Sequence, residues 1–430
     1  MRKLLATAAV LLVVPSLSFG SGFALFETGS RSFAMAGAFV AVADDPSAIF
    51  WNPAGLAFQD DKGTQVMMGA ILIAPEQTFY GENPYPGEGY STEQQDQIFF
   101  PPHFQFVTPL GERTTFGFGV QVPFGLGTYW DDDHAGRFLS KRVDLFAYDL
   151  TPNLAFKLND NLAIGIGADY RISTIDLTRN VPLVDPFSQQ VVDVAQAHIY
   201  TDGAGNDGWG WHAGFLAKLG KGWSLGVNYR SAITVDYKGY ADFFQFGTGN
   251  IELDQIVAQT IPFGETIEGT TQIEFPDFWI AGLAWTGERF TVSAEWGRMG
   301  WSSFQELALT FNDYPEFSES IPELYEDADQ YRLGFEFRAS QSIALQLGTL
   351  FDETPQPPAA MTPLLGDGDR TSVTCGLSWI KGGFRLDLGY EYLMMEDRST
   401  WDAEGGSLSG YNGHYESSAN LAGASMTFSF

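Results

Sequence analysis

Alternation of apolar and polar residues, broken by connections of two very different lengths, is the feature that most limits how this chain folds. In residues 223–229 and 384–392, every second side chain is apolar and the intervening ones are polar or glycine. This period of two indicates strands whose faces meet different surroundings. Fourteen such strands are predicted, over residues 64–73, 98–109, 113–123, 142–158, 161–178, 208–219, 222–240, 266–286, 288–312, 326–338, 341–353, 367–380, 383–397 and 411–430.

The connections between these strands alternate strictly between tight and long. The tight ones lie around residues 110–112, 159–160, 220–221, 286–287, 339–340 and 381–382. The long ones cover residues 74–97, 124–141, 179–207, 241–265, 313–325, 354–366 and 398–410. An even number of strands with short turns at one end and long loops at the other is typical of bacterial outer membrane barrels. The expected fold is therefore an all-β, 14-stranded antiparallel transmembrane barrel, with both termini on the side of the tight turns.

The two ends of the chain fit export to the outer membrane. Arg2 and Lys3 precede the apolar residues 4–14, and small residues follow up to Gly20, which predicts a cleaved signal peptide over residues 1–20. The last strand alternates up to a terminal Phe430 and resembles an assembly signal, so the barrel assembly machinery is an expected partner. An exported β-sandwich would also explain the alternation, but it would not explain the loop asymmetry or the last strand.

Composition narrows the class of protein. Beyond the signal, no apolar run approaches the ~20 residues of a membrane helix. Aromatic residues make up 15% of the chain, and its mean hydropathy is −0.08, as expected when lipid-facing and lumen-facing residues alternate. The net charge of −30 argues against nucleic acid binding and is compatible with lipopolysaccharide bridged by cations. The single cysteine, Cys375, excludes an internal disulfide.

Residues 21–63 do not alternate, and they predict a plug. They are rich in glycine and alanine; Asp45-Pro46 predicts a helix start, and residues 52–55 predict the turn that ends that helix. A barrel of fourteen strands leaves a lumen into which this segment fits. The expected domains are thus a signal peptide (1–20), an N-terminal plug or hatch (21–63) and a transmembrane barrel (64–430).

Short motifs in a fixed order then make the chain recognisable. They are residues 22–25, 43–45, 52–55, 102–104, 124–128, 209–214, 229–231, 276–279, 301–304, 331–334 and 351–355. Together they resemble the long-chain fatty acid transporter family of outer membrane proteins (FadL/TodX type, OmpP1). The resemblance implies a channel that takes up hydrophobic molecules, fatty acids first and aromatic hydrocarbons as the alternative. It also implies capture between the third and fourth long loops, transfer to a pocket above the hatch, and release by hatch movement, partly sideways through a kinked strand. The chain is expected to be a monomer, and no cofactor is expected because no metal or cofactor pattern is evident.

The resemblance also implies candidate residues. Phe23, Asn52, Pro53 and Asp352 match ligand-binding or gating positions, with Asn52 and Asp352 expected to interact; structural contacts that hold the hatch are the alternative for these two. Four arginines expected in the lumen are possible partners of a ligand carboxylate, unless they pair with wall acids: Arg171, Arg230, Arg332 and Arg385. Apolar residues at helical spacing in the fourth long loop predict either an external groove or packing against the neighbouring loop: Ile251, Leu253, Ile256 and Val257.

Other chemistry has weaker support. Asp131 to Asp133 with His134 could hold calcium, but their spacing lacks the order of a defined site, so no metal is expected. An outer membrane enzyme such as a lipase would need a nucleophile beside a base, and no histidine lies in such a pattern. An adhesin or a purely structural barrel would have no need for a plug. No residue decides which hydrophobic molecule is carried.

Overall fold

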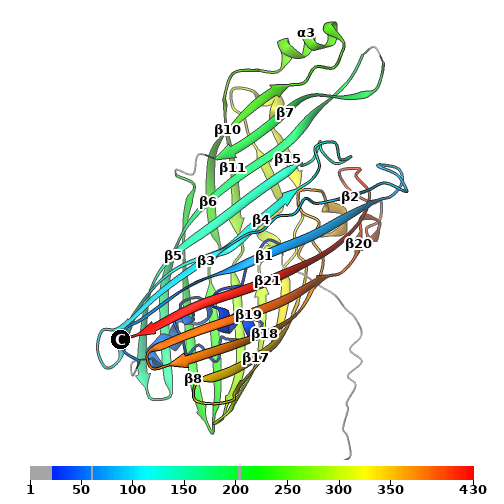
Figure 1. Ribbon diagram of the computed structural model, residues 1–430. Coiled ribbons are helices and arrows are strands. Elements are labelled where there is room, and N and C mark those ends of the chain that lie inside the picture. The colour runs from blue at the N-terminus through cyan, green and yellow to red at the C-terminus, as the bar shows by residue number, and fades with distance from the viewer. Residues whose placement is uncertain (1–21, 60–61, 187, 202–204) are drawn as a thin grey trace, which may run out of the picture.

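The protein forms a closed antiparallel barrel that is elongated at the end of the long loops, here called the outer end (Figure 1). The computed structural model describes residues 22–59, 62–186, 188–201 and 205–430, so the expected signal peptide lies outside the described residues. The ring has 14 strand positions, and β1 pairs with β21 from Gln65 opposite Ser429 to Gly81 opposite Gly413, which closes it. The positions are formed in order by β1 (Gln65–Gly81), β3 (Pro102–Pro109), β4 (Thr114–Tyr129), β5 (Arg142–Asn159), β6 (Leu162–Val184), β8 (Asp207–Gly220), β9 (Trp223–Arg230) with β10 (Ile233–Gln245), β11 (Ile267–Phe275) with β12 (Phe278–Thr286), β13 (Phe290–Met299), β16 (Ala328–Arg338), β17 (Ile343–Asp352), β18 (Arg370–Lys381), β19 (Phe384–Met395) and β21 (Gly413–Ser429).

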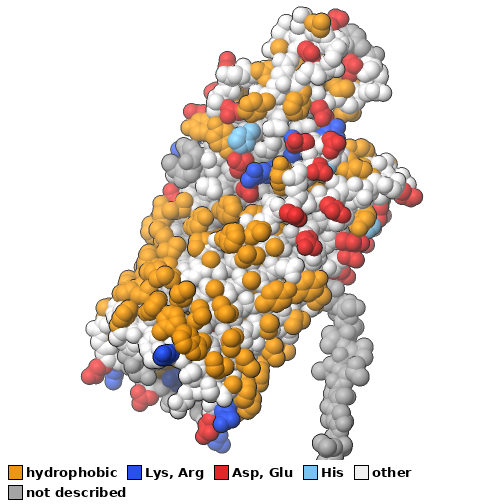
Figure 2. All heavy atoms as spheres, in the orientation of Figure 1, with side chains coloured by type: hydrophobic (Ala, Val, Ile, Leu, Met, Phe, Trp, Pro, Cys, Tyr) orange, Lys and Arg blue, Asp and Glu red, His pale blue; other side chains and the backbone are white. Residues whose placement is uncertain are grey.

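The two faces of the wall are the reverse of those in a soluble protein. In β16, Tyr331 and Leu333 are 47% and 56% exposed on the outside, whereas Arg332 and Glu336 are buried inside. Hydrophobic side chains cover much of the visible wall, and acidic side chains gather nearer to the long loops (Figure 2). This arrangement suits a barrel in lipid, because every backbone polar group of a closed ring is paired within the wall.

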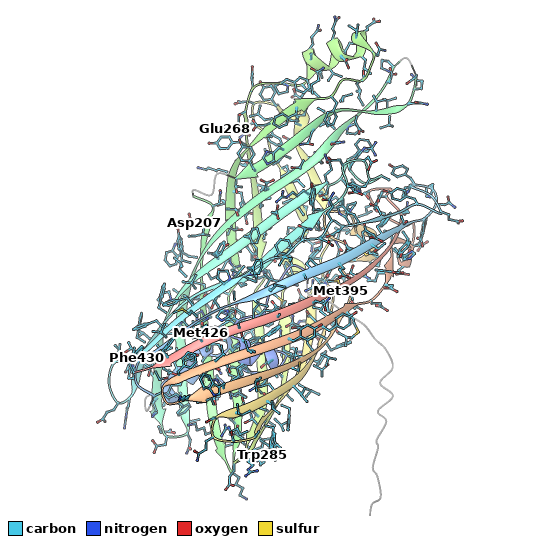
Figure 3. The ribbon with its side chains drawn as sticks, viewed as in Figure 1. Asp207, Glu268, Trp285, Met395, Met426 and Phe430 are labelled. Carbon is cyan, nitrogen blue, oxygen red and sulfur yellow. The ribbon has the colours of Figure 1, made fainter. Side chains whose placement is uncertain are left out.

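Tight and long connections occupy opposite ends, as the sequence predicts. Trp285, Met426 and Phe430 lie toward the tight turns, and Asp207, Glu268 and Met395 lie nearer to the long loops (Figure 3). Among the described residues, none of the helices has the length and apolar character to cross a membrane.

The structure corrects several strand predictions at the outer end. The strands expected to end at residues 73, 123 and 178 continue to Gly81, Tyr129 and Val184, because backbone pairing persists after the apolar alternation stops. A strand inside the third long loop, β7 (Val191–Thr201), pairs with both β6 and β10 and was not predicted. The short elements of the loops are β2 (Ser91–Glu93), α3 (Ile251–Thr260), η3 (Trp301–Ser303), β14 (Glu306–Leu309), η4 (Pro315–Phe317), β15 (Glu319–Pro322), η5 (Pro358–Ala360), β20 (Arg398–Ser399) and η6 (Thr400–Asp402).

Three predicted strands are interrupted. The strand expected over 222–240 breaks between β9 and β10, and the one expected over 266–286 breaks between β11 and β12 at Pro276. Proline has no N–H group, so Pro276 cannot donate a ladder hydrogen bond at this break. The strand expected over 288–312 ends at Met299, and β14 forms a separate hairpin with β15.

Accessibility on intact cells tests the orientation of the barrel. Tags inserted near Asp313 or Gly405, in long loops, should be cleaved or labelled from outside. Tags near Lys221 or Lys381, in tight turns, should stay protected until the cells are broken. The opposite pattern would show that the long loops face the periplasm.

Candidate functional site

Residues 22–59, here called the hatch, lie within the ring and contact walls on opposite sides of it. α1 (Ser30–Ala34) packs against β17, β18, β19 and β21, whereas η1 (Pro53–Phe58) packs against β4, β5, β6 and β8. Most of these residues are buried. Small residues make this close approach possible: a Cβ atom added at Gly214 of β8 would lie 2.2 Å from the Asn52 Oδ1 atom.

The helices of the hatch differ from the sequence prediction. The expected helix begins only at Ala48, because the Asp45 carboxylate accepts hydrogen bonds from the Ser47 N–H and hydroxyl groups and forms a turn before it. α2 (Ala48–Trp51) then ends at Asn52, whose side chain caps the 3-10 helix η1 rather than a simple turn. The helix α1 was not predicted.

Asn52 joins two parts of the hatch to the wall. Its amide Nδ2 donates to the Val40 carbonyl oxygen at 2.8 Å and to the Phe215 carbonyl oxygen of β8 at 3.0 Å. The next residue, Pro53, packs against Gly214 of the same strand. The Asn52 amide is thus directed to β8, whereas Asp352 ends β17 in another part of the ring. The expected pairing of Asn52 with Asp352 is not among the described contacts.

Replacing Asn52 with alanine tests its role as an anchor. The buried Val40 carbonyl and the part-buried Phe215 carbonyl would each lose a donor, and a group left unsatisfied when buried costs about 1–3 kcal/mol. We expect faster entry of small hydrophobic dyes into cells, while the heat-modifiable migration of the barrel on gels stays normal. The exposed Asn312→Ala variant is the matched control. Dye entry and channel conductance equal to wild type would show that Asn52 does not hold the hatch.

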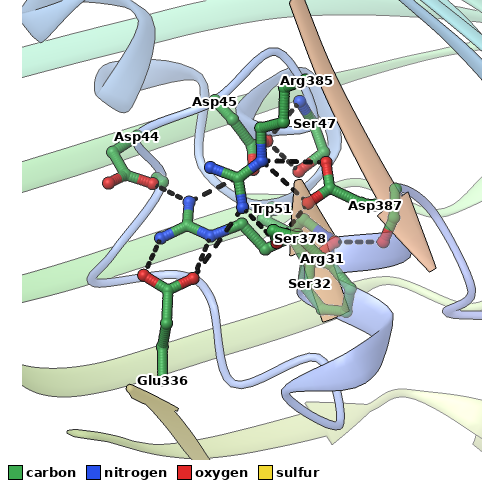
Figure 4. A network of polar contacts seen from close by, with 12 residues as sticks. Arg31, Ser32, Asp44, Asp45, Ser47, Trp51, Glu336, Ser378, Arg385 and Asp387 are labelled. Atoms are coloured by element: carbon green, nitrogen blue, oxygen red, sulfur yellow. Dashed lines mark hydrogen bonds and ion pairs between the residues drawn. The ribbon is translucent and has the colours of Figure 1, made fainter. Parts of the chain in front are cut away.

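A buried cluster of charges holds the other end of the hatch (Figure 4). Arg31 of α1 donates to Glu336 of β16 from Nε at 2.7 Å and from Nη2 at 3.1 Å. The same guanidinium also contacts Asp44 and Asp45 within the hatch. Arg385 lies beside this cluster, 2.8 Å from Asp387. We call Arg31, Asp44, Asp45, Glu336, Arg385 and Asp387 the Arg31 cluster. Arg31 was not among the predicted site residues, although it is the only basic residue between positions 21 and 61.

The other three predicted arginines also face inward and pair with wall acids. Arg171 binds Asp149 through two hydrogen bonds of 2.8 Å. Arg230 donates to Asp169 at 2.9 Å and to backbone oxygens of α2. Arg332 donates at 3.1 Å to Glu295, which also accepts the N–H groups of Phe39 and Val40. The arginines thus pair with wall acids, which was the stated alternative to binding a ligand carboxylate.

The first residues of the hatch lie against an irregularity in β4. Its pairing with β5 shifts register between Gln121 and Phe124. There Ala24 forms an antiparallel bridge with Phe124, with hydrogen bonds from Leu25 N–H to the Pro123 oxygen (2.8 Å) and from Gly125 N–H to the Phe23 oxygen (3.0 Å). The N-terminal segment thus covers the bulge from inside.

An apolar cavity of about 170 Å³ adjoins this bulge. Its lining comes from the start of the hatch and from the wall: Phe23, Leu25, Ile73, Phe99, Val122, Leu126, Leu393 and Leu421 are among its apolar members. The Phe23 ring is buried and lies 4.7 Å from the Trp301 ring and 6.1 Å from the Phe124 ring, centroid to centroid.

Two further apolar cavities lead from there toward the outer end. The second is lined by residues that include Phe23, Leu126, Ile175, Leu177 and Leu307. The third shares Ile175, Leu177 and Leu307 with the second and extends between β7, β10 and β11. Because neighbouring cavities share walls, we call the three together the apolar path.

The predicted groove residues divide into two groups. Leu253 and Val257 are buried under α3 and pack into the outer core. Ile251 and Ile256 are exposed at the tip, at 77% and 44%. Two of the four residues thus pack inward and two are exposed, so they do not form one continuous apolar surface.

The acidic stretch after β4 makes contacts of its own. Asp131 accepts from Gln95, Asp132 pairs with Lys141, and the His134 ring stacks on Trp130. Burial lowers the pKa of His134 to about 4, so this ring is neutral at physiological pH.

A polar contact at the base of the apolar path was not predicted. Asp367 Oδ2 accepts the Gly22 N–H at 2.8 Å, and Asp367 Oδ1 lies 3.0 Å from Arg370 Nη2, which also donates to the Gly22 oxygen. No sequence pattern marks this contact, because Gly22 and Asp367 are 345 residues apart in the chain.

Comparisons with known proteins agree with this architecture. A family model described as "Outer membrane protein transport protein (OMPP1/FadL/TodX)" matches residues 11–430. The long-chain fatty acid transport protein of Escherichia coli O6:H1 is 24% identical over 99% of this chain and 98% of its own length. The crystal structure of a Pseudomonas aeruginosa FadL homologue is similar with a TM-score of 0.80 and 20% identity, covering 95% of this chain and 100% of that one. The Pseudomonas putida toluene transporter TodX is similar with a TM-score of 0.71 and 18% identity, covering 95% and 100%.

Proposed function

This chain belongs to the OMPP1/FadL/TodX family of outer membrane transport proteins, and on that premise we propose that it carries long-chain apolar molecules along the apolar path. It is a channel of the outer membrane for hydrophobic compounds. The observation that supports the route most directly is the sharing of walls between successive cavities, from the region of β7 and β10 down to Phe23.

Fatty acids are the first candidate substrates and aromatic hydrocarbons the second. The E. coli relative is named a long-chain fatty acid transport protein, whereas the P. putida structure is that of a toluene transporter. An apolar path binds mainly through burial: about fifteen methylenes at ~0.8 kcal/mol each offer on the order of 10 kcal/mol before ordering costs. A charged hydrogen bond adds only ~1.5–3 kcal/mol. Chain length should therefore dominate affinity.

The hatch is the gate in this proposal. It fills the lumen below the path, and its first residues cover the bulge of β4. Movement of residues 22–25 away from Phe124 would open a way out beside β4, sideways into the wall or down the lumen. Asn52 and the Arg31 cluster would keep the rest of the hatch closed.

We further propose that the protein acts as a monomer without catalysis, folds with the barrel assembly machinery and contacts lipopolysaccharide through its acidic outer end. Of the imidazoles in the described lumen, His212 is held between Asp169 and Asn153, whereas His103 Nε2 lies 2.8 Å from the Ser425 hydroxyl, which also contacts the Ser30 hydroxyl of the hatch. The absence of catalysis is proposed because the matching family model and the similar E. coli protein are described as transport proteins. Ester hydrolysis by the purified protein, lost when one histidine is replaced, would instead favour an enzyme.

Calorimetry with carboxylic acids of increasing chain length, using purified protein, tests the route. Affinity should rise steadily with length, by up to roughly fourfold per methylene. Ala419→Phe, which points a ring into the first cavity, should weaken binding at least tenfold, or about 1.4 kcal/mol. Ala422→Phe, on the lipid face of the same strand, is the matched control. No dependence on length, together with no effect of Ala419→Phe, would show that ligands do not use this path.

A further inference from the structure

The walls of the apolar path carry more acidic than basic side chains, and this bears on the charge of the molecules that the path can bind. Among the described residues that line the three cavities, Arg370 is the only cation. Four acids share the same walls: Glu27, Glu76, Asp367 and Glu323. Burial raises the pKa of Glu323 to about 8, so this acid adds no negative charge near neutral pH, but it adds no positive charge either.

The one cation is already occupied. Arg370 pairs with Asp367 at 3.0 Å and donates to the Gly22 oxygen. Asp367 in turn accepts from the Gly22 N–H and from the Thr354 hydroxyl at 2.6 Å. The Arg370 Nε–H has no partner among the described atoms. It can donate to a hydroxyl, carbonyl or carboxylate oxygen, but the positive charge of the guanidinium is already balanced by Asp367.

The arginines below the path offer no free charge to a ligand. Arg171, Arg230 and Arg332 each have a carboxylate partner within 3.1 Å. A carboxylate that entered the path would lose water without gaining an unpaired cation, and it would come close to Asp367. Burial of an uncompensated charge is strongly unfavourable, and a neighbouring like charge disfavours it further.

We infer that the channel selects molecules without an ionised head group, so that a carboxylic acid binds in its protonated form and an alcohol, ester or hydrocarbon of equal length binds better than a carboxylate. This inference rests on the proposed function and narrows its substrate class. The charge balance around Arg370, set by Asp367, is the specificity-determining feature.

Calorimetry with dodecanoic acid, dodecanol and methyl dodecanoate tests it on the purified wild-type barrel in a non-ionic detergent. At about pH 8, where the acid is ionised, the alcohol and the ester should each bind at least tenfold more tightly than the acid. Lowering the pH to about 5 restores part of the neutral acid and should tighten its binding at least tenfold. The alcohol does not titrate, so its binding should change much less than that of the acid; any change it shows reports the titration of Glu323, whose pKa burial raises to about 8. Tighter or equal binding of the acid at about pH 8 would overturn the inference, whereas failure of all three ligands to bind would overturn the proposed function.

Substitution of Asp367 tests the assignment to these residues. Asp367→Asn keeps a hydrogen-bonding side chain but leaves the charge of Arg370 without its carboxylate partner. The affinity for the acid at about pH 8 should therefore rise roughly tenfold relative to the affinity for the alcohol, about 1.4 kcal/mol. Glu27→Gln, which removes a second acidic side chain from the same cavity, should shift the ratio in the same direction and serves if Asp367→Asn does not assemble. Asp313→Asn removes an equal charge from an exposed loop and should leave the ratio unchanged. An unchanged ratio in both cavity variants would overturn the role of this charge balance.

Discussion

Replacement of Arg31 by methionine should turn a closed channel into a leaking one. Arg31 is buried and is the shared partner of Glu336, Asp44 and Asp45. Removing one member of a buried ion pair leaves an uncompensated charge, which typically destabilises the arrangement by about 3–5 kcal/mol. The barrel wall does not depend on this contact, because its strands pair around a closed ring. The loss should therefore fall on the closed position of the hatch.

An effect of this size would raise the open fraction of the hatch at least a hundredfold, since about 1.4 kcal/mol corresponds to a factor of ten. Conductance of single channels in planar bilayers measures it directly, and entry of polar antibiotics into cells measures it in place. Arg298→Met is the matched control, because Arg298 pairs with Asp327 and Asp329 near the wall surface and is 44% exposed; exposed pairs contribute little. A silent Arg31→Met channel with normal gel migration would show that the Arg31 cluster does not keep the hatch closed.

The barrel was predictable because its pattern repeats within each strand. Tyr331, Arg332, Leu333 and Glu336 alternate between lipid and lumen in the structure as they do in the sequence. The number of strands and the two classes of connection were confirmed for the same reason. Strand ends at the outer side were wrong, because pairing outside the lipid needs no apolar face, and β7 carries no alternation strong enough to mark it.

The site was less predictable, because its contacts join residues far apart in the chain. The Asn52 amide donates a hydrogen bond to the backbone oxygen of Phe215, and Arg31 donates one to Glu336. No local pattern encodes such pairs. The resemblance to the family implied roles for Phe23 and Asn52, whereas the contact of Asp367 with Gly22 and Arg370 exists only in the folded chain. One local signal was present. Arg31 stands alone among small residues, and a charge confined within a barrel requires a partner, so this position predicts a buried ion pair.

A disulfide between the hatch and the wall should abolish transport reversibly. Ala24 and Phe124 are opposite each other in the bridge over the β4 bulge, with hydrogen bonds on either side between their neighbours. A pair flanked in this way belongs to the closely spaced class, with Cα atoms about 4.5 Å apart, which lies within the range that a disulfide spans. With Cys375 replaced by serine, the Ala24→Cys/Phe124→Cys variant should therefore form the bond on oxidation without moving the backbone.

Uptake of a radiolabelled fatty acid or of toluene by cells should fall at least tenfold when this bond forms and should return when a reductant breaks it, because residues 22–25 can no longer leave the bulge. Each single cysteine variant, oxidised in the same way, is the control. The Phe124→Cys variant alone measures the effect of losing the ring contact with Phe23 in the absence of a disulfide. The heat-modifiable migration of the barrel should be the same in both redox states, because the bond constrains only the start of the hatch. Full uptake by the oxidised variant, with the disulfide verified by mass spectrometry, would mean that the ligand leaves the apolar path while residues 22–25 stay in place.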